Sequence, residues 1–283
     1  MFRTRLLSGI ALVAIALGVF LSGGALMAVV VFGVSVIAYQ ELTRACKVRG
    51  EEMNPSAPVI VGLVMTLVYY GMLCLALARD ISVALPAMVV AIVAAFLAFL
   101  FVYVFAFPKY HANQIMSAMF SFLYGPVMLS FLFLLREGFE DGIYLVWFVF
   151  LASWGSDTCA YCVGVLIGKH KMTPKLSPKK SIEGAVGGIL GAALLFVLYA
   201  HFVVNQYTMM TLSLPLAAVL GAVGALVSMV GDLAASAVKR DHGIKDYGKL
   251  IPGHGGIMDR FDSVIVAAPI VFLGIALLEG IWL

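Results

Sequence analysis

The chain has 283 residues, of which 63% are hydrophobic and 12% are charged, and its mean hydropathy is +1.07. Soluble domains carry about 25% charged residues, so the composition excludes an ordinary water-soluble globular protein. Long apolar runs with few charges are typical of membrane-spanning helices, and we expect an all-α integral membrane protein. The net charge of +3 says nothing by itself about nucleic acid, and no nucleic-acid partner is expected.

A membrane-spanning helix needs about 20 mostly apolar residues. The sequence predicts about nine such helices, at 5–22, 24–40, 56–78, 81–107, 115–135, 142–168, 184–204, 212–238 and 263–282. The first run begins with two arginines and resembles a signal peptide, but a second run follows at once, which favours a retained helical hairpin. We divide the chain into an N-terminal block of helices, 1–110, and a region that holds the polar motifs, 111–283.

Lysine and arginine are distributed unevenly between the two ends of these predicted helices. Loops on the N-terminal side hold 16 of the 18 basic residues, and the other side holds Arg79 and Arg136. The positive-inside rule therefore places the N-terminus and its side in the cytoplasm. Loops 169–183 and 239–262 hold ten of the sixteen. Topology signals and attraction to anionic lipid would account for the charge, but not for the glycines and aspartates of the second loop.

Two aspartates lie inside predicted spans. Asp157 is roughly 18 Å and Asp232 roughly 10 Å from the next lysine along the helix, at 1.5 Å per residue. A charge at mid-bilayer costs about 2.5–3.5 kcal/mol, and such residues usually mark a site. Each shares a helix face with other polar or small residues: Ser153, Tyr161 and Gly164 in the first helix, and Ser228, Ser236, Lys239 and Arg240 in the second. The alternative is a structural hydrogen bond between helices.

Several short motifs between residues 159 and 191 indicate helix packing. Cys159 and Cys162 form a C-x-x-C, but no second pair stands at metal-ligand spacing, so ordinary small helix residues are favoured over a zinc or redox site. Gly184, Gly188 and Gly191 form a small face that lets helices approach closely. The segment GVLIGKH fails the phosphate-binding P-loop pattern and is rejected.

The segment PGHGGIMDRFDS, 252–263, is polar and rich in turn-forming residues. Its proline and glycines exclude a regular helix, and glycine permits positive φ and close approach to a ligand. Successive amides in such turns bind anions. Asp259 and Asp262 flank Arg260, and carboxylates beside a phosphate require a divalent cation, typically Mg²⁺. The pattern predicts a Mg²⁺–polyphosphate site in a cytoplasm-facing membrane cavity, suited to transfer between a nucleotide and a lipid.

The longer segment SAVKRDHGIKDYGKLIPGHGGIMDRFDS, 236–263, resembles the signature of the phosphatidate cytidylyltransferases, or CDP-diacylglycerol synthases. It has the S-x-x-K-R start, the K-D pair, the P-x-H-G-G turn and the closing D-R-x-D. Two upstream stretches, SDTCAYCVGVLIGKHK and SPKKSIEG, resemble others of the same family. Cys159 and Cys162 stand where aromatic residues are expected. The first 110 residues resemble the family only as a block of apolar helices.

The resemblance implies that CTP and phosphatidate react to give CDP-diacylglycerol and pyrophosphate. It makes Asp232 and Asp259 the metal-binding aspartates, and it makes Lys180 a lysine that acts on phosphate. Together with the residue patterns, it implies catalytic roles for Asp262 and His254 and substrate-binding roles for Asp157, Lys179, Ser236, Lys239, Arg240, Asp246, Gly255, Gly256 and Arg260.

The expected cofactor is Mg²⁺, with a second cation left open, and the expected partners are CTP, phosphatidate and membrane lipid. A homodimer is left open, and a bacterial inner membrane is the expected location. The rival hypotheses are a related enzyme that uses CTP on another lipid, such as a lipid kinase or a CDP-archaeol synthase, an ion-coupled transporter and a non-catalytic lipid-binding protein. A transporter leaves loop 239–262 unexplained, and we find no internal repeat of the kind common in transporters.

Overall fold

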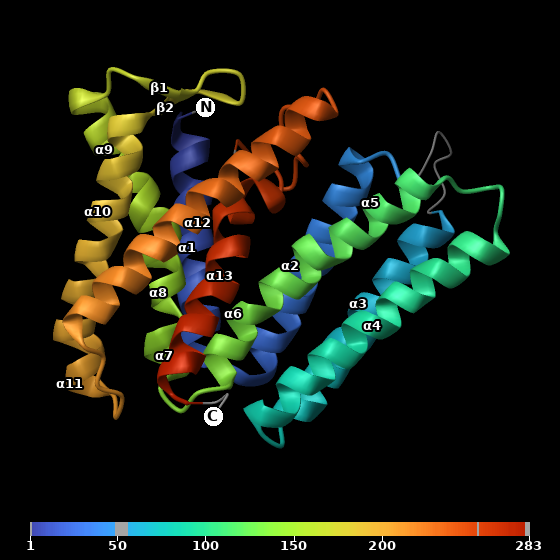
Figure 1. The fold of residues 1–283 in the computed structure, drawn as a ribbon, viewed down its shortest axis with the longest axis horizontal. Helices are drawn as coiled ribbons and strands as arrows, with labels where there is room; N and C mark the ends of the chain where they lie inside the picture. The colour runs from blue at the N-terminus through green and yellow to red at the C-terminus, as the bar shows by residue number, and fades with distance from the viewer. Residues whose placement is uncertain (1, 49–55, 254, 281–283) are drawn as a thin grey trace. The chain divides into compact units, whose positions relative to one another are not determined.

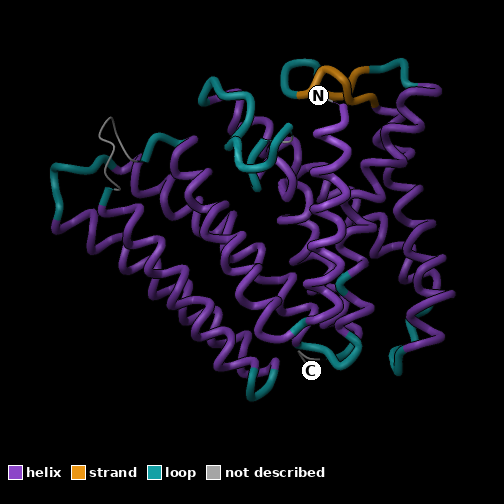
Figure 2. The backbone as a smooth tube through the Cα atoms, turned by 180° about the vertical axis from the view of Figure 1, so that it is seen from behind, coloured by secondary structure: helices purple, strands orange, loops and turns teal. Residues whose placement is uncertain are grey.

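The computed structural model describes residues 2–48, 56–253 and 255–280, without the side chains of residues 2–8, 10 and 12. Apart from loops and one pair of short strands, this part of the chain is helical (Figure 2). Eight helical stretches are long and apolar enough to cross a membrane: Gly24–Ala45, Ala57–Leu77, Ile81–Phe105, Ala112–Glu137, Gly142–Ile167, Ile182–Tyr207, Leu214–Asp241 and Met258–Leu278. The protein is therefore a multi-pass membrane protein.

These stretches coincide with eight of the predicted spans. The remaining predicted span, 5–22, falls on α1 (Phe2–Ser22), whose described apolar part, Val13–Ser22, is shorter than a bilayer requires. The prediction of about nine spans is thus confirmed for eight. The cytoplasmic placement of the N-terminus remains a prediction.

The chain forms two compact units, each described here by itself. Unit 1 comprises residues 1–138 and 241–260, and unit 2 comprises residues 139–240 and 261–283. The compact units divide at residue 138, and the glycine-rich loop belongs to the unit that holds the N-terminal helices. The functional boundary at residue 110 remains a prediction.

Unit 1 contains a bundle of long helices. Its elements are α1, α2 (Gly24–Ala45), α3 (Ala57–Leu77), α4 (Ile81–Phe105), α5 (Ala112–Phe122), the π-helical segment η1 (Leu123–Val127) and α6 (Met128–Glu137). Helices α3 and α4 run side by side in Figure 1. Segment η1 contains Pro126, which has no N–H to donate, and π-helical turns commonly form where the helix ladder is interrupted.

Hydrogen bonds between side chains hold the helices of unit 1 together. The hydroxyls of Ser35 and Tyr70 lie 2.7 Å apart and join α2 to α3, and those of Tyr69 and Ser130 lie 2.8 Å apart and join α3 to α6. All four residues are buried. Lipid tails are as apolar as leucine, so close packing and interhelical hydrogen bonds drive helix association in a membrane.

Unit 2 contains two long continuous helical segments and the longest single helix. Its elements are α7 (Gly142–Leu145), α8 (Trp147–Phe150), η2 (Leu151–Gly155), α9 (Ser156–Ile167), β1 (Lys171–Thr173), β2 (Ser177–Ser181), α10 (Ile182–Tyr199), η3 (Ala200–Val204), α11 (Asn205–Tyr207) and α12 (Leu214–Asp241). Helix α13 (Met258–Leu278) starts in unit 1 and continues into unit 2 from residue 261.

Glycines bring α9 and α10 close together, as predicted. A side-chain carbon at Gly184 would lie 2.8 Å from the Ala160 carbonyl oxygen, and one at Gly191 would lie 2.5 Å from Cβ of Cys159. Figure 1 shows the two helices side by side, with β1 and β2 at one end. Cys159 therefore serves in helix packing, and its thiol is free.

The predicted loop 169–183 contains an antiparallel β-hairpin. Strands β1 and β2 pair Lys171 with Ser181 and Thr173 with Ser177, with an irregularity between the two pairs. At the end of β2, the Ser181 hydroxyl accepts the Gly184 amide at 3.2 Å and so caps the start of α10. The hairpin gives Lys179 and Lys180, predicted to lie in a loop, a defined strand backbone.

Candidate active site

A cavity of about 470 Å³ lies within unit 2. Its wall comes from α9, the hairpin, the start of α10 and α12. The polar lining residues are Ser156, Asp157, Lys179, Lys180, Ser181 and Asp232, and the larger apolar ones are Tyr161, Val165, Met172 and Met229. The cavity thus combines a charged region with an apolar wall, a lining that suits a ligand with a phosphate group and a hydrocarbon part.

An ion pair lies inside the cavity. The Lys180 ammonium contacts the Asp232 carboxylate Oδ2, and each side chain is about one quarter exposed, at 25% and 27%. Lys180 comes from the last part of β2 and Asp232 from the second half of α12. Sequence analysis predicted both as site residues, and the structure brings them into direct contact.

Two further acidic residues in unit 2 belong to the same charged group. The Asp157 carboxylate interacts electrostatically with Lys180 and with Asp232, and that of Asp262 interacts with Asp232 and Lys239. Asp262 also accepts the Ser263 amide at 2.9 Å. The predicted polar stripe on α9 is confirmed for Asp157, Tyr161 and Gly164, which line the cavity. Ser153 is buried and bonds to the Val149 carbonyl oxygen instead.

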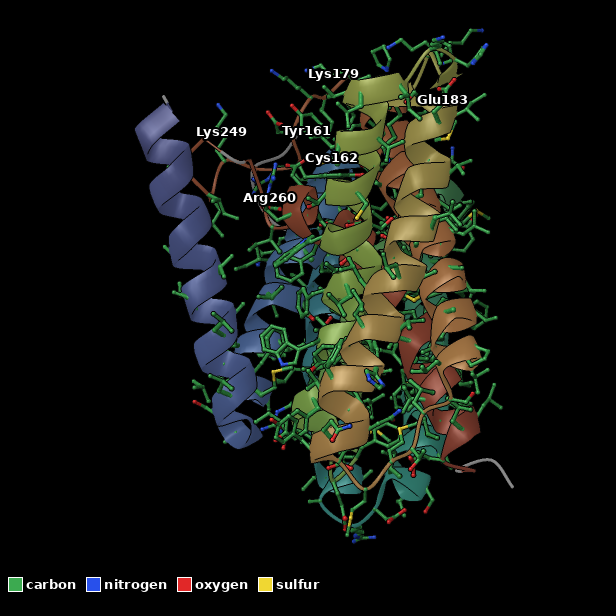
Figure 3. The ribbon with its side chains drawn as sticks, turned by 90° about the vertical axis from the view of Figure 1, so that its left-hand side faces the viewer. Tyr161, Cys162, Lys179, Glu183, Lys249 and Arg260 are labelled. Atoms are coloured by element: carbon green, nitrogen blue, oxygen red, sulfur yellow. The ribbon has the colours of Figure 1, made fainter. Side chains whose placement is uncertain are left out.

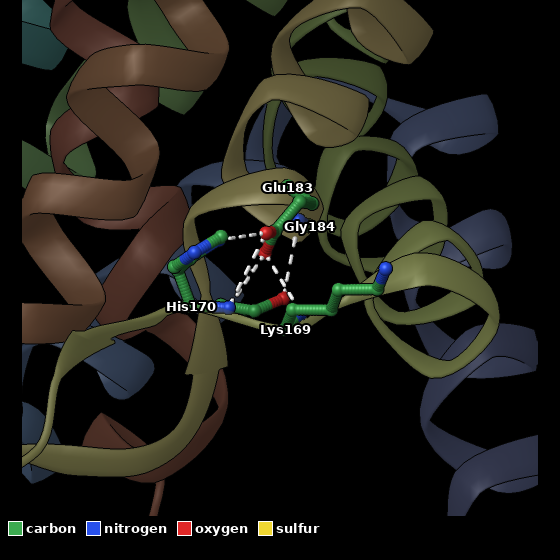
Figure 4. A network of polar contacts seen from close by, with 5 residues as sticks. Lys169, His170, Glu183 and Gly184 are labelled. Atoms are coloured by element: carbon green, nitrogen blue, oxygen red, sulfur yellow. Dashed lines mark hydrogen bonds and ion pairs between the residues drawn. The ribbon is translucent and has the colours of Figure 1, made fainter.

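The hairpin is anchored at its base by Glu183, in the first turn of α10 (Figure 4). One Glu183 oxygen accepts the Lys169 amide at 3.1 Å, and both lie 3.2 Å from the His170 amide nitrogen. The His170 Nδ1 atom lies 2.6 Å from Oε1. Figure 3 shows Lys179 and Glu183 at the same end of unit 2, with Tyr161 farther along α9. Glu183 is not among the predicted site residues, although an acidic residue in the first turn of a helix is a recognisable signal.

The glycine-rich loop, 241–257, lies in unit 1 and is held by carboxylates. Asp259 is 9% exposed, and its Oδ2 accepts the Tyr247 amide at 2.8 Å and the Gly256 amide at 3.0 Å. Gly255 has a φ of +88°, and a side-chain carbon there would lie 2.7 Å from this oxygen. The predicted need for glycine at positive φ is confirmed at Gly255. The Gly256 amide, which we expected to bind phosphate, donates to Asp259.

A second carboxylate supports the same loop. Glu41 of α2 accepts the amides of Ile257 and Met258, at 3.1 and 2.8 Å. Glu41 is not among the predicted site residues, because an acidic residue near the basic end of an apolar run has the appearance of a loop residue. No local pattern could have identified it, since its partners lie 216 and 217 residues away.

The predicted site residues therefore fall in both units. Ser236, Lys239 and Arg240 occupy the last turns of α12 in unit 2, while Asp246 and Arg260 are exposed in unit 1. His254 lies outside the described residues. Asp232 is in unit 2 and Asp259 is in unit 1, so the predicted cation shared between them remains a prediction.

The donor set of the cavity fits Mg²⁺ together with phosphate. Mg²⁺ in proteins is usually bound by one or two carboxylates, and substrate phosphates and water complete its coordination. Asp157 and Asp232 supply two carboxylates inside the cavity. Among the described residues, no three His, Cys, Asp or Glu side chains come together as a metal cage.

Comparison with known proteins agrees with this chemistry. Three relatives named phosphatidate cytidylyltransferase come from Synechocystis sp. (40% identical over 142 residues, 50% of this chain and 46% of the relative), Staphylococcus saprophyticus (36% over 140, 48% and 51%) and Mycobacterium bovis (37% over 171, 60% and 54%). The chain spans about half the length of these curated relatives. A profile of the cytidylyltransferase family matches residues 3–278, nearly the whole chain, and the protein belongs to that family.

Proposed function

We propose that the protein transfers CMP from CTP to phosphatidate, giving CDP-diacylglycerol and pyrophosphate for phospholipid synthesis. The observation that carries this proposal is the Lys180–Asp232 ion pair inside a cavity that also has an apolar wall. The family match and the names of the relatives support the same activity.

The reaction forms one P–O bond and breaks another. A phosphate oxygen of phosphatidate attacks the α-phosphorus of CTP, and the bond from that phosphorus to the oxygen bridging to the β-phosphate breaks. Pyrophosphate leaves with the bonding electrons. The attacking oxygen is already anionic at neutral pH, so no side chain has to remove a proton. The barrier comes mainly from repulsion between the anionic phosphates and from the need to align them. Fixed cationic groups reduce the repulsion and hold the phosphates in position.

Lys180 acts on the triphosphate. Without nucleotide it neutralises Asp232, and with nucleotide it exchanges that carboxylate for a phosphate oxygen. Lys179, the preceding residue of β2, is exposed and adds a second positive charge at the same cavity. Charge-assisted hydrogen bonds of this kind are about twice as strong as neutral ones and stabilise charge that develops on the leaving group.

Asp232 and Asp259 would bind the Mg²⁺ ion, with Asp157 and Asp262 as neighbouring negative charges. A Mg²⁺ ion held by these residues would supply positive charge that neutralises phosphate oxygens. Lys239, Arg240 and Arg260 supply further positive charge for phosphate, and Ser236, Asp246, His254, Gly255 and Gly256 complete the proposed substrate site. A second cation is left open.

The lipid lies against the apolar part of the cavity wall. Tyr161 and Val165 of α9 line the cavity and are 72% and 66% exposed, so an acyl chain can contact both from the bilayer. We place the cavity mouth on the cytoplasmic side of a bacterial inner membrane, since segments 169–183 and 239–262 carry ten of the eighteen basic residues. CTP then reaches it from the cytoplasm.

The position of radioactive phosphorus separates this proposal from its rivals. Purified protein in detergent receives phosphatidate, Mg²⁺ and CTP labelled at either the α- or the γ-phosphate. Cytidylyl transfer puts the α-label into lipid and releases pyrophosphate, whereas a lipid kinase puts the γ-label into lipid and releases CDP. A CDP-archaeol synthase would require the unsaturated ether lipid. If folded protein puts no α-label into any of the lipids supplied, the proposal is wrong.

A further inference from the structure

Near the end of α2, in the N-terminal block, lies a buried acidic residue. Glu41 is 4% exposed, within a helix that is long and apolar enough to span the membrane. An ionised carboxylate is costly in such surroundings unless hydrogen-bond donors surround it. Its donors therefore indicate what the residue does.

Both carboxylate oxygens of Glu41 accept backbone amides from the far end of the chain. Ile257 donates to Oε1 at 3.1 Å, and Met258 donates to Oε2 at 2.8 Å. Met258 is the first residue of α13, and amides at the start of a helix have no partner within that helix. Glu41 thus caps α13 from a different helix, and its negative charge faces the positive end of the helix dipole.

Two glycines of the loop leave room for this carboxylate. A side-chain carbon at Gly248 or at Gly256 would overlap the Glu41 oxygens. Neither glycine has a positive φ, so each could adopt its backbone conformation as alanine. Glycine is needed at these two positions for space, and the space is occupied by Glu41.

The backbone between these contacts leads directly to Asp259. Gly256 donates its amide to Asp259 Oδ2, and the next two amides, of Ile257 and Met258, bind Glu41. Residues 256–258 are therefore held between two buried carboxylates, and Asp259 follows at once. A shift of this short segment would move the Asp259 side chain with it.

We infer that Glu41 is a positioning residue for Asp259. It holds the start of α13 and the end of the glycine-rich loop in the geometry that a metal-binding carboxylate needs. This inference rests on the proposed function, in which Asp259 binds Mg²⁺. It also gives the N-terminal helices a part in the site, because the residue that sets the loop comes from α2.

Substitution by glutamine tests the inference with little change in size. Glu41→Gln replaces one acceptor oxygen by an NH₂ group that faces a backbone N–H, so one of the two caps is lost. We expect the Mg²⁺ concentration for half-maximal rate to rise about tenfold, with a smaller loss of kcat at saturating Mg²⁺. Glu41→Asp keeps both oxygens on a shorter side chain, and its Mg²⁺ concentration for half-maximal rate should lie between those of the wild-type protein and Glu41→Gln. A merely structural role would lower the yield of folded protein without moving the Mg²⁺ midpoint.

Limited proteolysis supplies a readout that needs no activity. Lys245 and Lys249 are exposed in the loop, and Lys171 and Lys175 are exposed in the hairpin of the other unit. In Glu41→Gln, trypsin should cut after the two loop lysines about tenfold faster, because lost caps raise the population of the open loop. Cleavage in the hairpin should keep its wild-type rate and serves as the internal standard.

Glu137 provides the matched control. Its Oε1 also accepts the amide of a helix start, Gly24 of α2, at 2.9 Å, and it lies in unit 1 too. Its other contact is Arg136, not the loop. Glu137→Gln should leave both the Mg²⁺ midpoint and the loop cleavage unchanged, which separates helix capping in general from support of Asp259.

Gly248→Ala approaches the same contact from the loop and covers the case in which Glu41 variants fail to fold. Alone it should reproduce both effects. In a Glu41→Ala background it should add little, since the overlapping carboxylate is gone and only the contact with the Gly256 Cα at 3.2 Å remains. Wild-type Mg²⁺ dependence and loop cleavage in Glu41→Gln or Gly248→Ala would overturn the inference. If the wild-type protein itself transfers no cytidylyl group, the proposed function fails, and the proteolysis still decides whether Glu41 holds the loop.

Discussion

The two basic loops of this protein are stabilised in opposite ways. The hairpin at 171–181 is held by its own strand pairing and by Glu183, which lies 13 residues from His170. The loop at 241–257 is held by Glu41, which lies more than 200 residues from the amides it binds. The hairpin is a local structure, whereas the glycine-rich loop depends on a helix from the N-terminal half.

This difference predicts how each loop responds to substitution. The hairpin backbone is held by its own strand pairing. Replacing one of its lysines should therefore change activity only through the loss of that lysine's charge. At the end of the glycine-rich loop, Asp259 accepts the Gly256 amide and Glu41 accepts the next two amides, so a change at one carboxylate disturbs the other. Effects should therefore be separable in the hairpin and strongly coupled in the loop.

The largest effect is expected at the two proposed metal ligands, one from each unit. Asp232→Asn and Asp259→Asn should each lower turnover by about a thousandfold or more, because the charge that binds the cation is lost. Turnover of phosphatidate by purified, folded protein is the measurement. Asp141→Asn is the control, since the Asp141 carboxylate accepts the Met209 amide at 3.0 Å and does not line the cavity. Normal turnover in either site variant would remove that residue from the metal site.

The next effect concerns the backbone of the loop. Gly255→Val meets both a φ of +88° and the nearby Asp259 carboxylate, so we expect turnover to fall about a hundredfold or the KM for CTP to rise strongly. Gly243 has a φ of +66°, but nothing lies within 4 Å of an added side-chain carbon. Gly243→Val therefore tests strain alone and should cost only a few fold.

Steady-state kinetics with each substrate varied distinguishes the possible outcomes for Gly255→Val. If only the KM for phosphatidate rises, the loop binds the lipid headgroup and our placement of the nucleotide is wrong. Equal defects in the Gly255 and Gly243 variants would mean that strain, not the contact with Asp259, explains the requirement for glycine.

The hairpin should show a sharp difference between two of its lysines. Lys180→Ala removes the partner of Asp232 inside the cavity, and we expect kcat/KM for CTP to fall about thirty- to a hundredfold. Lys171→Ala removes an exposed charge outside the cavity and should cost less than about twofold. If kcat/KM for CTP falls by a similar small factor in both variants, the hairpin lysines act in membrane topology and not on the nucleotide.

The smallest effect is expected at the hairpin anchor. Glu183→Gln weakens the contacts to His170 and Lys169 but leaves the strand pairing, so the KM for CTP should rise only about threefold with kcat unchanged. Trypsin cleavage after Lys171 and Lys175 is the companion measurement and should rise by a similar factor. A loss as large as that of Glu41→Gln would show that the hairpin is no more self-supporting than the glycine-rich loop.

Much of the site was predictable because its residues break the apolar pattern. Asp157 and Asp232 are charged residues within spans, and Lys180 follows a proline in a basic segment, so each is visible in the sequence. The helix-packing glycines Gly184 and Gly191 were visible by their spacing. Glu183 was recognisable only as an acidic residue in the first turn of a helix, and Glu41 had no local signal at all, because its partners lie more than 200 residues away.

By itself, the sequence determined that the chain spans the membrane several times, since about 20 apolar residues are needed for each crossing and hydropathy records them directly. It also determined where the chemistry-bearing residues stand along the chain. Only the tertiary structure decided which of them meet. In the structure Lys180 pairs with Asp232, and Glu41 accepts the amides of Ile257 and Met258. Such contacts between distant segments depend on how the helices pack, and short-range residue patterns do not encode that packing.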